Sequence, residues 1–335
     1  MRRELPLAVA ACAPALSPSL SLSDPLPAMT HEFDLIAKLR AGFSRPAGVK
    51  VGLGDDTAVL DWSQRGDCLV TVDMLMEGVD FTWETATPRQ VGRKSLAVNL
   101  SDIAAMAGRP VACVVAVSLP KQGGWELGLE LLAGIRELAE EFDVAVVGGD
   151  TNTWNGPLVI SITVLGEPTG RGPVLRSGAQ VGDRVFVTGP LGGSLLGHHL
   201  TFTPRVALAQ QLHARFDLHS LIDLSDGLAA DLGHILEESR VGAVLETHRL
   251  PVTPAAHLRA EQSGRTPLEH ALSDGEDFEL VGSLPASQAA ALDASGLAVC
   301  VGEIVERAGL WLRHPDGTEQ PLAFAGWKHG FTAPR

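Results

Sequence analysis

Short apolar runs alternate with helix-like segments along most of the chain. The runs have the length of strands, contain many β-branched residues and end at Gly, Pro or Asp, which is the pattern of β-strands. They cover residues 68–72, 111–119, 144–147, 158–165, 184–188, 218–224, 278–282 and 298–304. We therefore predict an α/β or α+β protein, although the pattern does not determine the order of the strands.

Between these runs lie segments with helical periodicity. Thr87-Pro88 is typical of an N-cap followed by a first helical residue, and it predicts a helix that runs to about residue 107. Segment 124–142 has apolar residues at helical spacing along one face, so that face should be buried. Further helices are expected at residues 31–41, from Thr203-Pro204 onward and at 225–239.

A Gly- and Pro-rich connection at 166–182 interrupts this alternation. A boundary there suits the length of the chain, because 335 residues is about twice the size of a typical domain. We predict an N-terminal α/β domain over 29–168 and a C-terminal α+β domain over 178–331. Residues 1–28 differ in composition, and we expect a disordered extension or a true start of translation at Met29.

The chain is acidic. Asp and Glu number 40 and Lys and Arg number 26, so the formal net charge is −14. This balance disfavours binding to nucleic acid or to an anionic membrane, and no run of about 20 apolar residues predicts a membrane span. The four Cys residues are far apart, which indicates neither a zinc site nor a disulfide framework and favours the cytoplasm. Tyr is absent, so no mechanism can rely on a phenol.

Several aspartates lie beside Gly or Ser at the predicted ends of elements. They are Asp55, Asp56, Asp73, Asp102, Asp150, Asp223 and Asp226. Taken singly, each is explained by a turn or a helix cap, and Ser225 with Asp226 would then cap the helix at 225–239. Taken together, they are what a site for several Mg²⁺ ions needs, because Mg²⁺ takes carboxylate oxygens together with substrate phosphates. We therefore expect these side chains to converge in one cleft that binds anions through metal.

Other common motifs are missing. The sequence has no GxxxxGKS/T, GxGxxG, HExxH or GxSxG. Segment 189–194, Gly-Pro-Leu-Gly-Gly-Ser, allows two interpretations, a phosphate cradle of backbone N–H groups or a plain turn. The eleven His residues are scattered, and the adjacent pair His198-His199 is more typical of packed or surface imidazoles than of a metal site.

Five motifs occur in order between residues 52 and 280, and the match that they belong to spans about residues 30–331. They are 52–58 (GLGDDTA), 97–108 (AVNLSDIAAMAG), 148–151 (GGDT), 222–235 (IDLSDGLAADLGHI) and 275–280 (GEDFEL). In combination these motifs resemble the thiamine-monophosphate kinase family, whereas GGD or SDG alone would mean little. The resemblance implies the two-domain fold of the aminoimidazole-ribonucleotide-synthetase-like superfamily, with mixed sheets and flanking helices. It also implies a homodimer that pairs through the N-terminal sheet, with the nucleotide in the groove between the domains.

The same resemblance implies the reaction ATP + thiamine monophosphate → ADP + thiamine diphosphate, assisted by several Mg²⁺ ions. The positions that match metal ligands of the family are Asp56, Thr71, Asp73, Asp102, Asp150, Asp223 and Asp226. Those that match nucleotide contacts are Gly149, Asp150, Arg176 and Ser225, and those near thiamine monophosphate are Asp80, Glu276 and Trp327. No general base is expected, because the acceptor phosphate is already largely ionised at neutral pH.

Four positions depart from the common family pattern. Val72 replaces a frequent Thr or Ser, so a side-chain hydroxyl contact is lost there. Asp80 stands where relatives can have His. Phe278 and Trp327 stand where Tyr is frequent, and a ring without the hydroxyl favours stacking over hydrogen bonding.

Two other classes of function stay open from the sequence. A metal-dependent phosphohydrolase would use the same aspartates and would release phosphate from ATP or from thiamine monophosphate alone. A non-catalytic, exported protein that binds a thiamine ester is the second, because residues 9–12 (VAAC) resemble a lipoprotein cleavage box.

Overall fold

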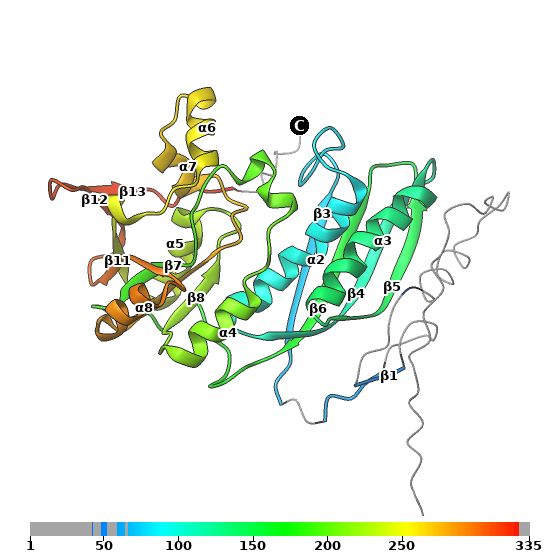
Figure 1. The fold of residues 1–335 in the computed structure, drawn as a ribbon, viewed down its shortest axis with the longest axis horizontal. Helices are drawn as coiled ribbons and strands as arrows, with labels where there is room; N and C mark the ends of the chain where they lie inside the picture. Colours follow the sequence, from blue (N-terminus) through cyan, green and yellow to red (C-terminus); the bar gives the residue numbers. More distant parts are fainter. Residues whose placement is uncertain (1–41, 43–47, 52–58, 64–65, 328–335) are drawn as a thin grey trace, which may run out of the picture.

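Two mixed β-sheets with flanking helices form the two halves of the molecule (Figure 1). The structure is a computed structural model, and it describes residues 42, 48–51, 59–63 and 66–327. The helix predicted at 31–41 and the predicted ligand Asp56 lie outside the described residues. Within them, no helix is both long and apolar enough to cross a membrane.

The first half is a four-stranded sheet in the order β3-β6-β4-β5, in which only β4 and β5 run parallel. Its strands are β3 (Leu69–Met76), β4 (Arg109–Pro120), β5 (Ala145–Trp154) and β6 (Val159–Glu167). Helices α2 (Pro88–Ala105) and α3 (Gly124–Glu141) cover one face (Figure 1). The strands extend beyond the predicted runs, so Asp73 and Asp150 lie within strands and not at strand ends, which corrects the prediction.

The second half is a seven-stranded sheet in the order β13-β12-β9-β11-β7-β10-β8. Its strands are β7 (Arg184–Val187), β8 (Ser220–Asp223), β9 (Gly242–Glu246), β10 (Leu280–Leu284), β11 (Val299–Val305), β12 (Gly309–Arg313) and β13 (Glu319–Leu322). Its helices are α4 (Val206–Arg215), α5 (Leu228–Ser239), α6 (Pro254–Ser263), α7 (Pro267–Ser273) and α8 (Ala289–Ser295). Helices α4 and α5 each begin three residues later than predicted.

Helix α2 begins where the sequence predicts. Thr87 is its N-cap, and a capping box with Gln90 satisfies N–H groups that the first turn leaves unpaired. The helix also packs closely on α3, because a Cβ at Gly92 would lie 1.8 Å from the carbonyl oxygen of Leu131. Only glycine fits there, so the close approach of α2 to α3 depends on it.

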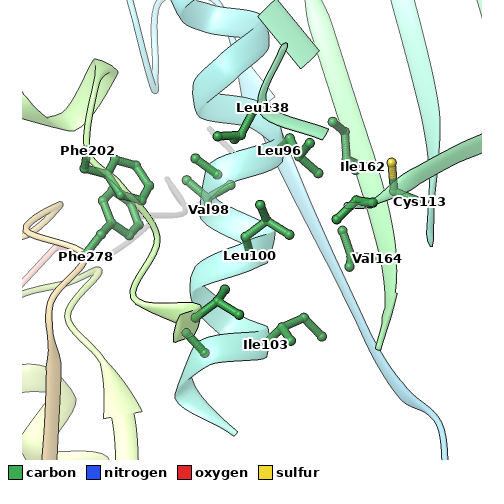
Figure 2. Close-up of a cluster of buried hydrophobic side chains, with 14 of the residues drawn as sticks. Leu96, Val98, Leu100, Ile103, Cys113, Leu138, Ile162, Val164, Phe202 and Phe278 are labelled. Atoms are coloured by element: carbon green, nitrogen blue, oxygen red, sulfur yellow. The ribbon is translucent and has the colours of Figure 1, made fainter. Parts of the chain in front are cut away.

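Helix α2 is apolar on two sides and lies between the two halves of the molecule. Figure 2 shows Phe202 and Phe278 on one side of it, and Cys113, Ile162 and Val164 on the other. The rings of Phe202 and Phe278 stack with centroids 4.0 Å apart. One continuous hydrophobic core therefore joins the four-stranded sheet to part of the C-terminal half, with α2 inside it.

Within the residues that the structure describes, no helix covers the other face of the four-stranded sheet, which we call the helix-free face. At one end, strands β1 (Val49–Val51) and β2 (Val59–Leu60) place Val49 and Leu60 against its apolar residues. Beyond that end, large apolar side chains are exposed. They are Val70, Val72, Met74 and Met76 on β3, Val114 on β4 and Trp154 on β5.

Candidate active site

Three aspartates from distant segments face one another between the two halves. Asp73 lies on β3, Asp102 near the end of α2, and Asp223 at the end of β8. The pKa values of Asp73 and Asp223 are both raised to about 7, first by burial and then by the negative charge of Asp102. Burial also raises the pKa of Asp102. The structure thus brings together three of the predicted metal ligands as mutually repelling, poorly solvated carboxylates.

Side chains of α2 and β3 fix this cluster. The Thr71 hydroxyl donates to the Asp102 carboxylate, and Ser101 Oγ donates to Asp223 Oδ2 at 2.6 Å. The backbone N–H of Asp73 donates to Asn99 Oδ1 at 3.1 Å. Asn99 and Ser101 were not predicted as site residues, although their place beside Asp102 in the 97–108 motif is the signal that could have identified them.

A positive charge lies close to the cluster. Arg176 lies in the connection between the two sheets, and its charge partly offsets the rise in the pKa of Asp102 and of Asp223. Its backbone carbonyl accepts a hydrogen bond from Ser239 Oγ at 3.2 Å, which fixes the chain there. The predicted nucleotide contact Arg176 therefore lies beside two of the predicted metal ligands.

The turn at 224–227 connects the carboxylate cluster to the predicted acceptor residues. The carbonyl of Ser225 accepts the N–H of Glu276 at 2.7 Å, and that of Asp226 accepts the N–H of Trp327 at 3.1 Å. Two adjacent peptide groups thus hold two residues that are predicted to lie near thiamine monophosphate, on segments about 50 residues apart in sequence.

Asp231 supports this turn from within α5. Its Oδ2 accepts the N–H groups of Asp226 and Gly227, each at 3.0 Å. Burial first, and then the charges of Asp223 and Asp226, raise the pKa of Asp231 to about 8. Helix α5 begins at Leu228 with Gly227 as N-cap and no side-chain cap. The alternative that Ser225 and Asp226 only cap this helix is therefore wrong.

A buried ion pair links the two halves near the acceptor residues. Lys94 of α2 is fully buried, and its Nζ lies 2.6 Å from Glu276 Oε1 and 3.0 Å from the carbonyl oxygen of Asp80. The Asp80 carboxylate accepts the N–H of Met76 at 2.7 Å, so it stabilises its own turn. Lys94 was not predicted, and a single lysine in an apolar helix gave no sequence signal.

The loop at 189–194 is a structural turn. The N–H of Gly192 donates to Asp277 Oδ1 at 2.9 Å, and that of Gly193 donates to Asp274 Oδ2 at 3.2 Å. The protein's own carboxylates therefore occupy the donors that a phosphate would need. Of the two interpretations of this loop, the phosphate cradle is wrong.

Asp150 lies apart from the cluster in the single chain. It pairs with Ala116 on the helix-free face of the sheet, whereas Thr71 and Asp73 point to the face that α2 covers. Strands β3 and β5 are also the two opposite edges of this sheet. Gly149 precedes Asp150, and a Cβ there would lie 2.1 Å from the carbonyl oxygen of Val115, so close strand pairing itself requires glycine.

The cluster suits a hard cation by its chemistry. Its ligands are carboxylate and hydroxyl oxygens, and a divalent ion would offset the repulsion that burial intensifies. Within the described part of the chain, no three His, Cys, Asp or Glu side chains already surround one point as a metal cage would. Mg²⁺ takes carboxylate oxygens together with substrate phosphates, so the carboxylates of this cluster fit it by type.

Comparison with known proteins agrees with the fold. Residues 54–167 match the family described as AIR synthase related protein, N-terminal domain. The thiamine-monophosphate kinase of Rhodopirellula baltica is 44% identical over 311 residues, which cover 90% of this chain and 98% of that protein.

Two solved structures are similar over most of the chain. The thiamine-monophosphate kinase from Stenotrophomonas maltophilia K279a matches with a TM-score of 0.73 at 37% identity, covering 85% of this chain and 96% of its own. AaThiL complexed with AMPPCP and TMP matches with a TM-score of 0.71 at 29% identity, covering 89% and 97%. These similarities confirm the fold class that the sequence predicts.

Proposed function

The chain belongs to the thiamine-monophosphate kinase family, and we propose that it transfers the γ-phosphoryl group of ATP to thiamine monophosphate by direct in-line displacement. The observation that carries this proposal is the carboxylate cluster of Asp73, Asp102 and Asp223, which lies between the two halves beside the turn that holds Glu276 and Trp327. The cluster offers a place for phosphates and metal, and the turn offers a place for the acceptor.

Mg²⁺ belongs to this proposal. Asp73, Asp102 and Asp223 would hold the ions, with Thr71 and Asp226 beside them, and Asp56 is proposed from its motif alone. Bound Mg²⁺ neutralises phosphate charge and aligns the attacking and leaving oxygens. Arg176, whose charge already acts on Asp102 and Asp223, would contact the nucleotide phosphates together with Ser225.

The chain needs no general base for this reaction. The acceptor is a phosphate monoester whose second pKa is about 6, so its oxygen is largely ionised at neutral pH. The obstacle is the approach of two polyanions, which positioning and charge compensation overcome. Because the ionised acceptor oxygen can attack the γ-phosphorus itself, the proposed transfer needs no phosphoenzyme.

We further propose a cytoplasmic homodimer in which each site takes Asp150 from the second copy. The helix-free face exposes Val72, Met74, Val114 and Trp154, and an apolar patch of this kind is typical of an interface. Asp150 and the preceding Gly149 lie on the opposite edge from Asp73, so one chain alone does not bring them to its own cluster. When two copies pair face to face, the edge that carries Asp150 can meet the edge that carries Asp73 of the other copy.

An assay of ADP release tests the proposed function. We expect ADP only when ATP, thiamine monophosphate and Mg²⁺ are all present, and we expect chelation of the metal to stop it. Release of phosphate from ATP alone would instead indicate a phosphohydrolase, and binding without turnover would indicate a binding protein. Transfer of ³²P from labelled ATP onto the protein would contradict direct transfer.

A further inference from the structure

We propose that Lys94 is a positioning residue for the acceptor, which acts by orienting the carboxylate of Glu276 toward the cationic heterocycle of thiamine monophosphate. This inference rests on the proposed function and adds to it the residue that prepares the acceptor end of the site. Its basis is a buried contact that crosses from α2 to the 275–280 segment.

The main chain of Glu276 is held at both ends. Its N–H donates to the carbonyl of Ser225 at 2.7 Å, and its own carbonyl accepts from Ser194 Oγ at 2.5 Å. Its φ of 55° lies in the left-handed region, which is uncommon for a residue other than glycine. Such a conformation is typical of a residue whose position matters for function.

The Lys94 ammonium fixes the side chain of Glu276, which the hydrogen bonds of its main chain do not hold. It lies 2.6 Å from Glu276 Oε1 and 3.0 Å from the carbonyl oxygen of Asp80, so it joins two segments that are both predicted to lie near the acceptor. None of the Lys94 side chain is exposed to solvent, so it acts through Glu276 and does not touch the substrate.

One oxygen of the same carboxylate has no partner. Glu276 Oε2 is buried, and the described part of the chain offers it no hydrogen bond. A buried acceptor without a partner is costly, which is a reason to expect that a ligand supplies the missing donor. A carboxylate accepts hydrogen bonds at both oxygens, so Oε2 can accept a donor from a ligand while Oε1 binds the Lys94 ammonium.

The charges of thiamine monophosphate indicate which half of the molecule Glu276 Oε2 would contact. A carboxylate repels the phosphate group of thiamine monophosphate but attracts its positively charged thiazolium ring and the amino group of its pyrimidine. Glu276 therefore recognises the heterocyclic half, while the aspartate cluster lies at the phosphate half. Loss of Lys94 should weaken binding of the acceptor much more than binding of ATP.

Steady-state kinetics of three variants test this inference. We expect Lys94→Met and Glu276→Gln each to raise the KM for thiamine monophosphate about tenfold or more and to change the KM for ATP less than about twofold. Because Lys94 acts through Glu276, the double variant should be no worse than Glu276→Gln alone. The double variant also removes both buried charges, so it provides the measurement if Lys94→Met alone does not fold.

Arg93→Met is the matched control. Arg93 is the neighbouring residue on α2, and its guanidinium donates to the carbonyl of Phe202 at 2.8 Å, so it also links the two halves. We expect no selective effect on the acceptor KM in this variant. Equal increases in both KM values for Lys94→Met, or additive losses in the double variant, would overturn the inference while the kinase activity of the wild-type chain stands. A wild-type chain without thiamine-monophosphate-dependent ADP release would overturn the proposed function, and this inference with it.

Discussion

Asp73 and Asp150 lie on opposite faces and at opposite edges of the same four-stranded sheet. A one-residue irregularity in the pairing of β4 with β5 accounts for the difference in face. Cys113 pairs with Val146, but Val114 pairs with Gly148, so β5 contains one extra residue. Since successive side chains of a strand alternate between faces, this bulge turns Asp150 away from α2 and toward the exposed apolar face.

The placement of Asp150 away from its own chain's cluster predicts that two different inactive variants can form one intact site in a mixed dimer. Asp102→Asn and Asp150→Asn should each lose most turnover as pure dimers, and the pair should regain activity when their subunits are mixed. A mixed dimer carries both defects in one site and neither in the other, so random mixing should restore about a quarter of the wild-type activity. Thiamine-monophosphate-dependent ADP release measures the recovery.

The matched control mixes Asp102→Asn with Asp223→Asn. These two residues belong to the same chain's cluster, so each site of a mixed dimer keeps one defect and no recovery is expected. If the first mixture also stays inactive after subunit exchange has been verified, then Asp150 does not act in the site of the other copy.

The carboxylate cluster predicts that the Mg²⁺ requirement depends on pH. The pKa of Asp73 and that of Asp223 are both raised to about 7, chiefly by burial, so protons compete with metal below that pH. The Mg²⁺ concentration for half-maximal activity should therefore fall as the pH rises from 6 to 8, by roughly tenfold or more. Activity titrations at fixed saturating ATP and thiamine monophosphate measure it, and a concentration that is constant over this range would contradict the assignment of these ligands.

Asp231 predicts a pH dependence of stability in the metal-free protein. Its pKa is raised to about 8 by burial and by the charges of Asp223 and Asp226. A carboxyl group whose pKa is raised on folding stabilises the fold fully below its unfolded value, near 4, and that contribution is lost as the pH rises through 8. Asp231→Asn keeps an oxygen for the N–H groups of Asp226 and Gly227 and removes the buried charge.

We therefore expect Asp231→Asn to be more stable than the wild type at pH 8.5, by about 2 kcal/mol, and to differ little from it at pH 4. Urea unfolding in the presence of a chelator, followed at both pH values, gives the two free energies of unfolding. A gain that is equal at both pH values would show that packing, and not the charge of Asp231, is responsible.

The sequence predicted correctly those helix and strand boundaries that depend on neighbouring residues in the chain. The start of α2 was predicted correctly because Thr87 and Pro88 determine its first turn through the capping box and the proline. Strand β5 was predicted four residues long, but it extends over ten, because its second part is polar and gains its pairing from the backbone of β4. An apolar-run criterion misses a strand of this kind.

In the site, too, local sequence signals predicted some features and missed those that depend on contacts between distant segments. The motifs identified Asp73, Asp102 and Asp223 by residue type and order, and the fold brings them together. The pattern did not show the bulge that turns Asp150 to the other face, since a bulge depends on the pairing partner. Nor did it show Lys94, whose contact with Glu276 joins residues 182 positions apart.

Trp327 predicts a selective loss of acceptor binding. Trp327 is 56% exposed, and its backbone N–H donates to the carbonyl of Asp226, so its backbone lies beside the turn at 224–227 that follows Asp223. An aromatic face binds a cationic heterocycle by stacking and by cation–π attraction. Trp327→Ala should raise the KM for thiamine monophosphate by about tenfold, and Trp327→Phe should restore much of the loss.

Phe324→Ala separates stacking from anchoring of the tail. Phe324 lies in the same segment but packs over Gly233 of α5, where a Cβ would come within 2.7 Å of its ring. This variant loosens the segment and leaves the indole intact, so we expect a smaller change, shared between the two KM values. If Trp327→Ala and Phe324→Ala raise both KM values alike, then the tail contributes its backbone position and the indole does not stack on the acceptor.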